Sequence, residues 1–318
     1  STPLPMYLSY GVMQGFGQGM IYTVILATVQ RWFPDRTGFA SGVVVTANGL
    51  CGFFLAPLSR KLLEAEGVQK TFLSWILCGI FFQAPDKSLV NAGGSAAKSG
   101  TSEMKQYTSG EMMRTRNFYL LLATMFFGLI SYFMVSPVSQ TYQIDLGIPS
   151  AVAVSAVMLG SIVNAGARLV LPTLADKVGR IVCIKGVLIV AVIAMGVLAV
   201  SRSLAVTVAV VLMYGCYGGI MGSFPSLTSS IFGMKHTGEN YGFVMFGIVF
   251  ATFGAPAISG LVSSKGYEMN VVFGIGAVFA VIAFVCLTLL GRNLVKEHAE
   301  KSAGVKNDTA QVSKPQAE

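Results

Sequence analysis

Residues 203–234 read SLAVTVAVVLMYGCYGGIMGSFPSLTSSIFGM, without a single Asp, Glu, Lys or Arg. A helix needs about 20 apolar residues to cross a membrane, and a strand of a closed barrel needs only about half as many. A charge-free stretch of this length therefore predicts a transmembrane helix. Comparable charge-free stretches recur along the chain, at residues 1–30, 37–59, 117–144, 240–264 and 269–291.

The composition of the whole chain also indicates a membrane protein. Of its 318 residues, 53% are hydrophobic and 11% are charged, and the mean hydropathy is +0.67. A soluble domain carries about 25% charged residues. We expect an all-α membrane protein with about nine transmembrane helices. The expected spans are residues 7–30, 38–59, 71–84, 117–140, 150–174, 181–200, 204–229, 240–264 and 269–291.

The basic residues indicate how these helices are oriented. Most of the 22 lysines and arginines fall in loops on the same side as the C-terminal tail. Cytoplasmic loops carry an excess of Lys and Arg, so we expect the C-terminus in the cytoplasm and the protein in the plasma membrane, which is the inner membrane of a bacterium. The net charge of +8 follows from this bias and does not indicate nucleic-acid binding.

An internal repeat relates the first two expected spans to two later ones. Phe33-Pro-Asp-Arg-Thr37-Gly38 recurs as Phe232-Gly-Met-Lys-His-Thr237-Gly238, and Tyr10-Gly11 recurs as Tyr214-Gly215. Parallel repeats of membrane helices are typical of secondary transporters, which bind substrate between two halves. The spans between residues 117 and 200 have no counterpart in the repeat. We therefore expect about three further helices before the first residue of this chain.

The repeat and the composition divide the chain into four expected parts. Residues 1–84 form a partial N-terminal helical bundle, and residues 117–291 form a complete six-helix bundle. Residues 85–116 between them are polar and rich in Gly and Ser, a composition typical of flexible linkers, here a cytoplasmic one. Residues 292–318 form a cytoplasmic tail, which we expect to be disordered or a short surface helix.

Arg168 is the only charged residue between residues 146 and 175. A charge at the centre of a membrane costs about 2.5–3.5 kcal/mol on insertion scales, so we expect Arg168 to face a hydrated cavity. A guanidinium there is suited to bind a carboxylate. The alternatives are snorkelling to the cytoplasmic interface and pairing between helices. Asn164 lies one turn away on the same face, within reach of the guanidinium or the ligand.

Further polar residues complete the candidate sites. Three of them within the spans are expected to contact substrate, with packing as the alternative: Tyr22, Tyr217 and Asn48. Asp176, Gly179 and Arg180 lie in a short turn between two spans. There Asp176 is placed to cap a helix N-terminus and to pair with basic neighbours. We interpret this turn as a gate at the cytoplasmic end, and an ordinary basic loop is the alternative.

Several motifs are similar to those of one transporter family. Arg31-Trp-Phe-Pro-Asp-Arg-Thr-Gly38, Tyr107-Thr-Ser-Gly-Glu-Met-Met-Arg-Thr115, Asn164-Ala-Gly-Ala-Arg168 and Asn240-Tyr-Gly242 resemble segments of the oxalate/formate antiporter family. Leu174–Arg180 resembles a loop motif of the major facilitator superfamily, which contains that family. The resemblance spans nearly the whole chain. It implies a two-bundle helical transporter that works by alternating access, with Arg168 binding the substrate carboxylate.

The resemblance also bears on the cargo. Oxalate-transporting members have a second cation where this chain has Ile248, and a single arginine suits a monocarboxylate. The related monocarboxylate transporters have an acid where this chain has Asn164, which disfavours proton coupling. We therefore expect exchange of small carboxylate anions. The alternatives are a proton-coupled monocarboxylate symporter, a broad-specificity exporter and a truncated protein that does not transport.

Other functional classes are not expected. His236 and His298 both lie outside the expected spans, so the sequence does not predict an enzyme. The five cysteines fall within expected spans and form no CxxC pair, a pattern that predicts neither a metal site nor a cofactor. The expected partners are a small carboxylate anion and the lipid bilayer, and we expect a monomer.

Overall fold

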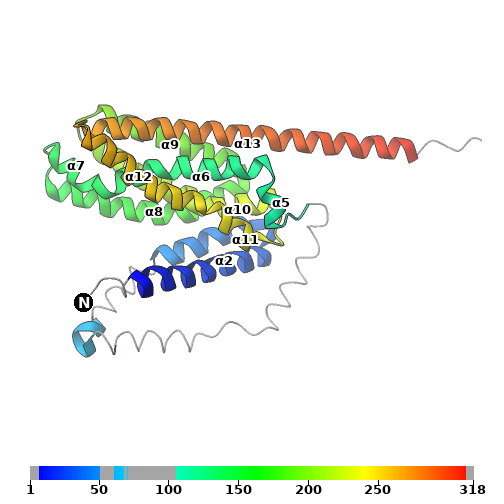
Figure 1. Ribbon diagram of the computed structural model, residues 1–318, viewed down its shortest axis with the longest axis horizontal. Helices are drawn as coiled ribbons and strands as arrows, with labels where there is room; N and C mark the ends of the chain where they lie inside the picture. Colours follow the sequence, from blue (N-terminus) through cyan, green and yellow to red (C-terminus); the bar gives the residue numbers. More distant parts are fainter. Residues whose placement is uncertain (1–6, 51–60, 68–69, 71–104, 313–318) are drawn as a thin grey trace, which may run out of the picture.

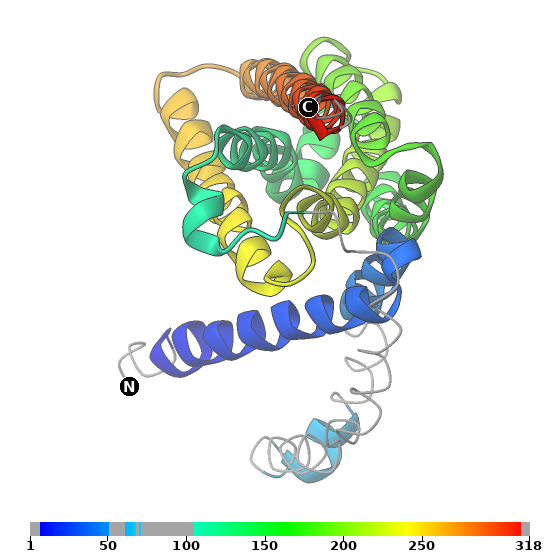
Figure 2. The ribbon, with the colours of Figure 1, turned by 90° about the vertical axis from the view of Figure 1, so that its right-hand side faces the viewer.

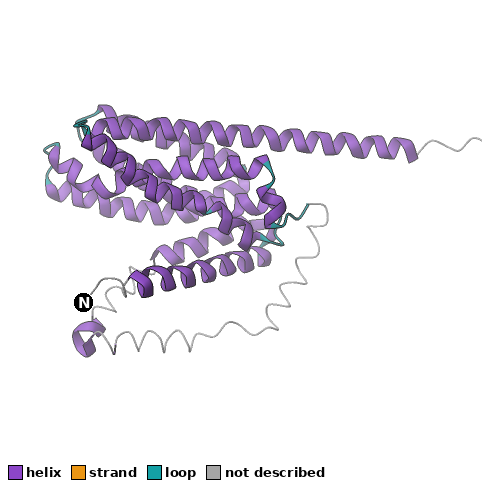
Figure 3. Cartoon of the chain, in the orientation of Figure 1, coloured by secondary structure: helices purple, strands orange, loops and turns teal. Residues whose placement is uncertain are grey.

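The structure is a computed structural model that describes residues 7–50, 61–67, 70 and 105–312, and every regular element in these residues is a helix (Figure 3). The predicted all-α fold is therefore confirmed. Seven helical segments within these residues are long and apolar enough to cross a membrane. The expected span 71–84 and the last part of the expected span 38–59 lie outside the described residues.

Apart from residues 61–67 and 70, which are helical, the described residues fall into two groups, which we call the N-half (residues 7–50) and the C-half (residues 105–312). The N-half contains η1 (Tyr7–Gln14), α2 (Gly15–Trp32), the turn η2 (Pro34–Arg36) and a helix over residues 37–50, called helix 37–50. The C-half contains α5 (Ser109–Met113), α6 (Arg116–Val135), η4 (Ser136–Val138), α7 (Ser139–Asp145), α8 (Ser150–Val178), α9 (Arg180–Val200), α10 (Ala205–Phe232), α11 (Thr237–Val244), α12 (Phe246–Ser264) and α13 (Met269–Val312).

The last helix is longer than expected. α13 runs without interruption from Met269 to Val312 and extends past the rest of the bundle (Figure 1). Residues 292–312 thus continue the final span as helix, and they form neither a disordered tail nor a separate surface helix. Extending an existing helix avoids the cost of nucleation, and this segment holds no proline that would stop it.

Close packing of α8 on α10 positions the candidate site. The core of the C-half lies among α6, α9, α10 and α13, with Phe224 and Phe273 among its largest fully buried side chains. Small residues let membrane helices approach closely. A Cβ atom on Gly218 would collide with the backbone of Asn164, and one on Gly222 would lie 2.6 Å from the carbonyl oxygen of Arg168. These glycines bring the middle of α8 directly against α10.

The N-half lies along one side of the C-half, as the two views in Figures 1 and 2 show. α2 contacts α11, and helix 37–50 contacts α8. The turns at residues 33–37, 178–180 and 233–236 gather at one end of the bundle, which we call the turn end. Helix 37–50 and α11 both begin there, and they begin at the equivalent positions of the internal repeat, Thr37 and Thr237.

Candidate functional site

The guanidinium of Arg168 lies between the two halves. Its Nε donates to the side-chain oxygen of Asn164 on the same helix (3.0 Å), and its Nη1 donates to the carbonyl oxygen of Val45 in helix 37–50 (3.4 Å). The guanidinium carbon also lies 5.4 Å from the centre of the Tyr217 ring on α10. Contacts with three helices hold the group inside the protein, which argues against snorkelling to the interface.

Helix 37–50 reaches α8 through small side chains. A Cβ on Gly42 would lie 2.8 Å from the carbonyl oxygen of Arg168, and the hydroxyl of Thr46 donates to the carbonyl oxygen of Ala165 (3.5 Å). Positions three and four residues apart share a helix face. Gly42, Val45 and Thr46 therefore form one contact surface along α8, and Arg168 lies on it.

An aromatic cluster supports the Arg168 side chain from the C-half. The ring of Tyr217 stacks on that of Tyr132 on α6, with centres 4.2 Å apart and planes 14° apart. Tyr132 in turn meets the edge of Tyr214, with centres 5.3 Å apart. Tyr132 is one of several tyrosines within the expected spans and was not among the residues predicted to contact substrate. The sequence does not set it apart from the others, because only the packing of α6 on α10 brings it beside Tyr217.

The other predicted substrate contacts differ in where they lie. The hydroxyls of Tyr22 on α2 and Tyr241 on α11 are both buried, and neither makes a hydrogen bond within the described residues. Asn48 is exposed, and within the described residues no hydrogen bond joins it to the guanidinium. The next residue, Gly49, is the one whose Cβ atom would meet Arg168, 3.1 Å from Nη1.

The junction between α8 and α9 joins the two halves. Asp176 lies in the last turn of α8 and Arg180 begins α9, so only Gly179 of the three residues expected in a turn lies between the helices. The carboxylate of Asp176 accepts hydrogen bonds from the backbone N–H groups of Gly38 (3.1 Å) and Phe39 (3.0 Å), at the start of helix 37–50. Arg180 donates to Asp176 (3.3 Å) and to the hydroxyl of Thr37 (2.8 Å). Asp176 thus caps a helix of the opposite half, where a negative charge also interacts favourably with the helix dipole.

Two glycines shape the turns at this end. Gly179 has a φ of 107° between α8 and α9, and Gly233 has a φ of 87° after α10, both in a region that favours glycine. The carbonyl oxygens of Met234 and Lys235 after Gly233 accept hydrogen bonds from Arg31 at the end of α2. The turn end is therefore closed by two sets of contacts between the halves.

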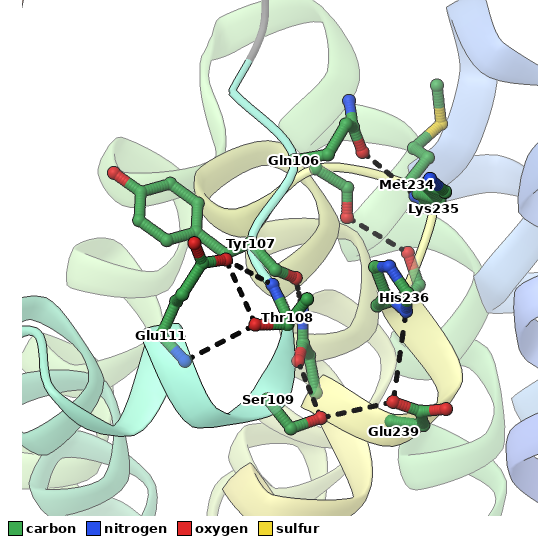
Figure 4. A network of polar contacts seen from close by, with 12 residues as sticks. Gln106, Tyr107, Thr108, Ser109, Glu111, Met234, Lys235, His236 and Glu239 are labelled. Carbon is green, nitrogen blue, oxygen red and sulfur yellow. Dashed lines mark hydrogen bonds and ion pairs between the residues drawn. The ribbon is translucent and has the colours of Figure 1, made fainter.

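The end of the expected linker is ordered. The backbone N–H of Tyr107 donates to the carbonyl oxygen of Phe232 (3.0 Å), and its carbonyl oxygen accepts from Asn240 (3.0 Å). Thr108 and Glu111 then form a capping box that starts α5 (Figure 4). The expectation of a flexible linker is thus wrong for residues 105–115, because these bonds fix them against the turn between α10 and α11.

The capping box predicts a pH-dependent α5. The backbone N–H and then the hydroxyl of Thr108 donate to Glu111 and hold the pKa of that carboxyl below its ordinary value of 4.5. A depressed pKa adds stability above the unfolded value, which is lost as the pH falls through the folded value. We expect hydrogen exchange in residues 108–113, corrected for intrinsic rates, to rise as the pH falls below 4.5, the ordinary pKa of this carboxyl.

Glu111→Gln is the matched control for this prediction. Glutamine preserves the capping box but cannot titrate, so the variant should show no acid-induced rise in exchange over residues 108–113. A rise of equal size in both proteins would assign the effect to another group.

Comparison with known proteins identifies the family. Residues 1–253 match the model of the Major Facilitator Superfamily. The chain is 28% identical to the oxalate:formate antiporter of Oxalobacter formigenes over 293 residues, which cover 90% of this chain and 70% of that protein. It is 30% identical to the uncharacterized MFS-type transporter YhjX of Escherichia coli (strain K12) over 254 residues, 76% of this chain and 61% of that protein.

A shorter match adds a third relative. The chain is 36% identical to the human monocarboxylate transporter 11 over 67 residues, which cover 21% of this chain and 14% of that protein. The chain thus spans less than two thirds of the length of YhjX and 70% of that of the antiporter. With its membrane-spanning helices and these matches, the chain belongs to the major facilitator superfamily of multi-pass membrane transporters, and within it resembles the oxalate:formate antiporter.

Proposed function

We propose that the protein is a secondary transporter that exchanges small carboxylate anions by alternating access, with Arg168 as the substrate-binding residue. The observation that carries this proposal is the position of the Arg168 guanidinium, which contacts Val45 of one half and Tyr217 of the other. A charge-assisted bond to a carboxylate there is strong because the surroundings have a low dielectric constant. The names of the antiporter and monocarboxylate transporter relatives support a carboxylate cargo.

The neighbours of Arg168 favour a monocarboxylate. Its described partners, Asn164, Val45 and Tyr217, are all uncharged. Position 248 is an isoleucine, which carries no charge and is partly buried against the apolar core of the C-half, so it supplies no second cation. A dicarboxylate would leave one charge unpaired in a partly buried site, which is costly. A monocarboxylate carries one negative charge, which the single positive charge of Arg168 neutralises.

The turn end is proposed as the cytoplasmic gate. By the positive-inside rule this end faces the cytoplasm, and the contacts of Asp176, Arg180 and Arg31 close it. Alternating access requires these bonds to break when the site opens inward. We also propose that residues 1–84 and 117–291 form two bundles that move against each other. The proposed location of the protein is the plasma membrane.

Counterflow in vesicles tests the proposed function. The complete protein, reconstituted into vesicles preloaded with unlabelled lactate, is expected to take up labelled lactate or formate faster than oxalate. A proton gradient should leave the rate unchanged. Proton-stimulated uptake would indicate a symporter, and unsaturable uptake of larger apolar compounds would indicate a broad-specificity exporter. Absence of any uptake of these acids would contradict the proposed exchange of small carboxylates.

A further inference from the structure

A groove lined by basic residues lies between α9 and α13 at the turn end. The two helices pack along each other (Figure 1), and the groove has a volume of about 820 Å³. Three of the residues that line it are basic: Lys185 on α9, and Arg292 and Lys296 on α13. We call it the basic groove. It is separate from the candidate site at Arg168, because both of its helices belong to the C-half.

Helical spacing explains why these side chains share one groove. Thr288, Arg292 and Lys296 follow one another at intervals of four residues, which places them on one face of α13. All three line the groove, as do Ile181 and Lys185, which are four residues apart on α9. The two helices therefore present facing rows of side chains, and the basic groups lie between them.

The cations of the basic groove have no acidic partner. Within the described residues, none of the three forms an ion pair, and α9 contains neither Asp nor Glu. Glu297, which follows Lys296, instead accepts a hydrogen bond from Asn117 on α6 (2.9 Å). Like charges that share a groove repel one another. An anion bound among them would therefore be held by all three and would lower their repulsion.

The depth of the groove indicates where this anion comes from. Lys185 lies five residues after the start of α9, so it is about 7.5 Å further into the membrane than the turn end. Its ammonium lies 5.9 Å from the centre of the Phe284 ring on α13. A charge at this depth, beside an aromatic ring, is at the level of the lipid headgroups and not in bulk water.

Apolar side chains continue the groove toward the middle of the bilayer. Ile189 lies one turn beyond Lys185 on α9, and Val285 lies about one turn before Thr288 on α13. Both are exposed, at 49% and 48% of their surface. A free inorganic anion has no use for such a surface, whereas an acyl chain attached to a phosphate would cover it. The combination therefore favours a lipid over a soluble anion.

We propose that the basic groove binds an anionic phospholipid of the cytoplasmic leaflet, with the lipid phosphate among Lys185, Arg292 and Lys296. One acyl chain lies along Ile189 and Val285. Basic pockets between membrane helices on the cytoplasmic side suit anionic headgroups. Since both helices belong to the C-half, the lipid stays in place when the two halves move and ties α13 to α9. The inference does not depend on the cargo or on Arg168.

The test is a lipid titration of the complete protein, delipidated in neutral detergent, with bound lipid counted by native mass spectrometry. Separate arms contain phosphatidylglycerol, phosphatidylcholine and inorganic phosphate. We expect saturable binding of phosphatidylglycerol, and weaker binding of phosphatidylcholine, which has the same phosphate but no net charge. An excess of inorganic phosphate should not displace phosphatidylglycerol, because it lacks the acyl chain.

Two matched double variants locate the binding. Lys185→Gln combined with Lys296→Gln should weaken phosphatidylglycerol binding about 25-fold, since each cation beside an anionic lipid contributes about fivefold. Lys177→Gln combined with Lys235→Gln also removes two lysines from the turn end, but these are exposed and outside the groove. This control should bind phosphatidylglycerol like the unsubstituted protein.

Three outcomes would overturn the proposal. Equal binding of phosphatidylglycerol by the groove variant and the unsubstituted protein would show that the lipid does not bind in this groove. Equal binding of the two lipids by the unsubstituted protein would exclude selection by charge. Displacement of phosphatidylglycerol by inorganic phosphate would assign the groove to a soluble anion.

A second measurement uses only the unsubstituted protein, and therefore remains decisive if the groove variant does not fold. Amide hydrogen exchange in residues 288–297 is expected to be slower in phosphatidylglycerol bilayers than in phosphatidylcholine bilayers, because the bound lipid holds this part of α13 against α9. Equal exchange in the two bilayers would contradict the proposal.

Discussion

Arg168→Gln is expected to lower carboxylate exchange by about 100-fold or more. Hydrogen bonds to charged groups contribute about 1.5–3 kcal/mol each, and each 1.4 kcal/mol changes binding about tenfold. Losing a bidentate bond and the charge behind it therefore removes most of the affinity for an anion. The measurement is the initial rate of lactate counterflow in vesicles, normalised to the amount of reconstituted protein.

Two further variants make this result specific to the site. Arg168→Lys keeps the positive charge but loses the planar fork that binds a carboxylate through two donors, so it should retain an intermediate rate. Arg202→Gln removes an arginine that is exposed and paired with Glu268 on the surface, and it should leave exchange unchanged. Undiminished exchange by Arg168→Gln would refute the proposed binding site.

Asp176→Ala is expected to open the turn end. The substitution removes the acceptor of the Gly38 and Phe39 N–H groups and the partner of Arg180. Loss of such a helix cap costs about 0.5–2 kcal/mol, so the ratio of closed to open forms should fall by about two- to thirtyfold. Amide hydrogen exchange at residues 38 and 39 should rise by a similar factor. The rate of carboxylate transport should fall by a larger factor than the affinity of the protein for carboxylate.

Asp145→Ala provides the comparison for this prediction. Asp145 ends α7, away from the turn end, so its loss should not affect exchange at residues 38 and 39. Equal protection of those amides in Asp176→Ala and in the unsubstituted protein would show that the cap does not hold the halves together.

Part of the site was predictable because it lies within single helices. Arg168 and Asn164 are four residues apart, so helical geometry alone places them on one face, and the structure joins them by a 3.0 Å hydrogen bond. The capping role of Asp176 was predictable, since a carboxylate beside a helix N-terminus is typical of that role, although Asp176 lies in the last turn of α8 and not in a loop. The sequence did not indicate that the capped helix would belong to the other half.

Other residues were beyond prediction because they depend on which helices meet. Asn48 is polar and Gly49 is not, so polarity favoured Asn48, whereas packing against α8 turned Gly49 toward Arg168. Tyr132 joined the site through stacking on Tyr217. These positions follow from the close approach of separate helices, which no periodicity within one helix can specify.

The sequence by itself determined that the chain is a bundle of membrane helices with one charge held inside, because charge-free stretches of this length have a stable place only across a bilayer. Only the tertiary structure decided what that charge touches. Arg168 meets Val45 and Tyr217 because glycines at 42, 218 and 222 let three helix backbones approach within side-chain reach of one another.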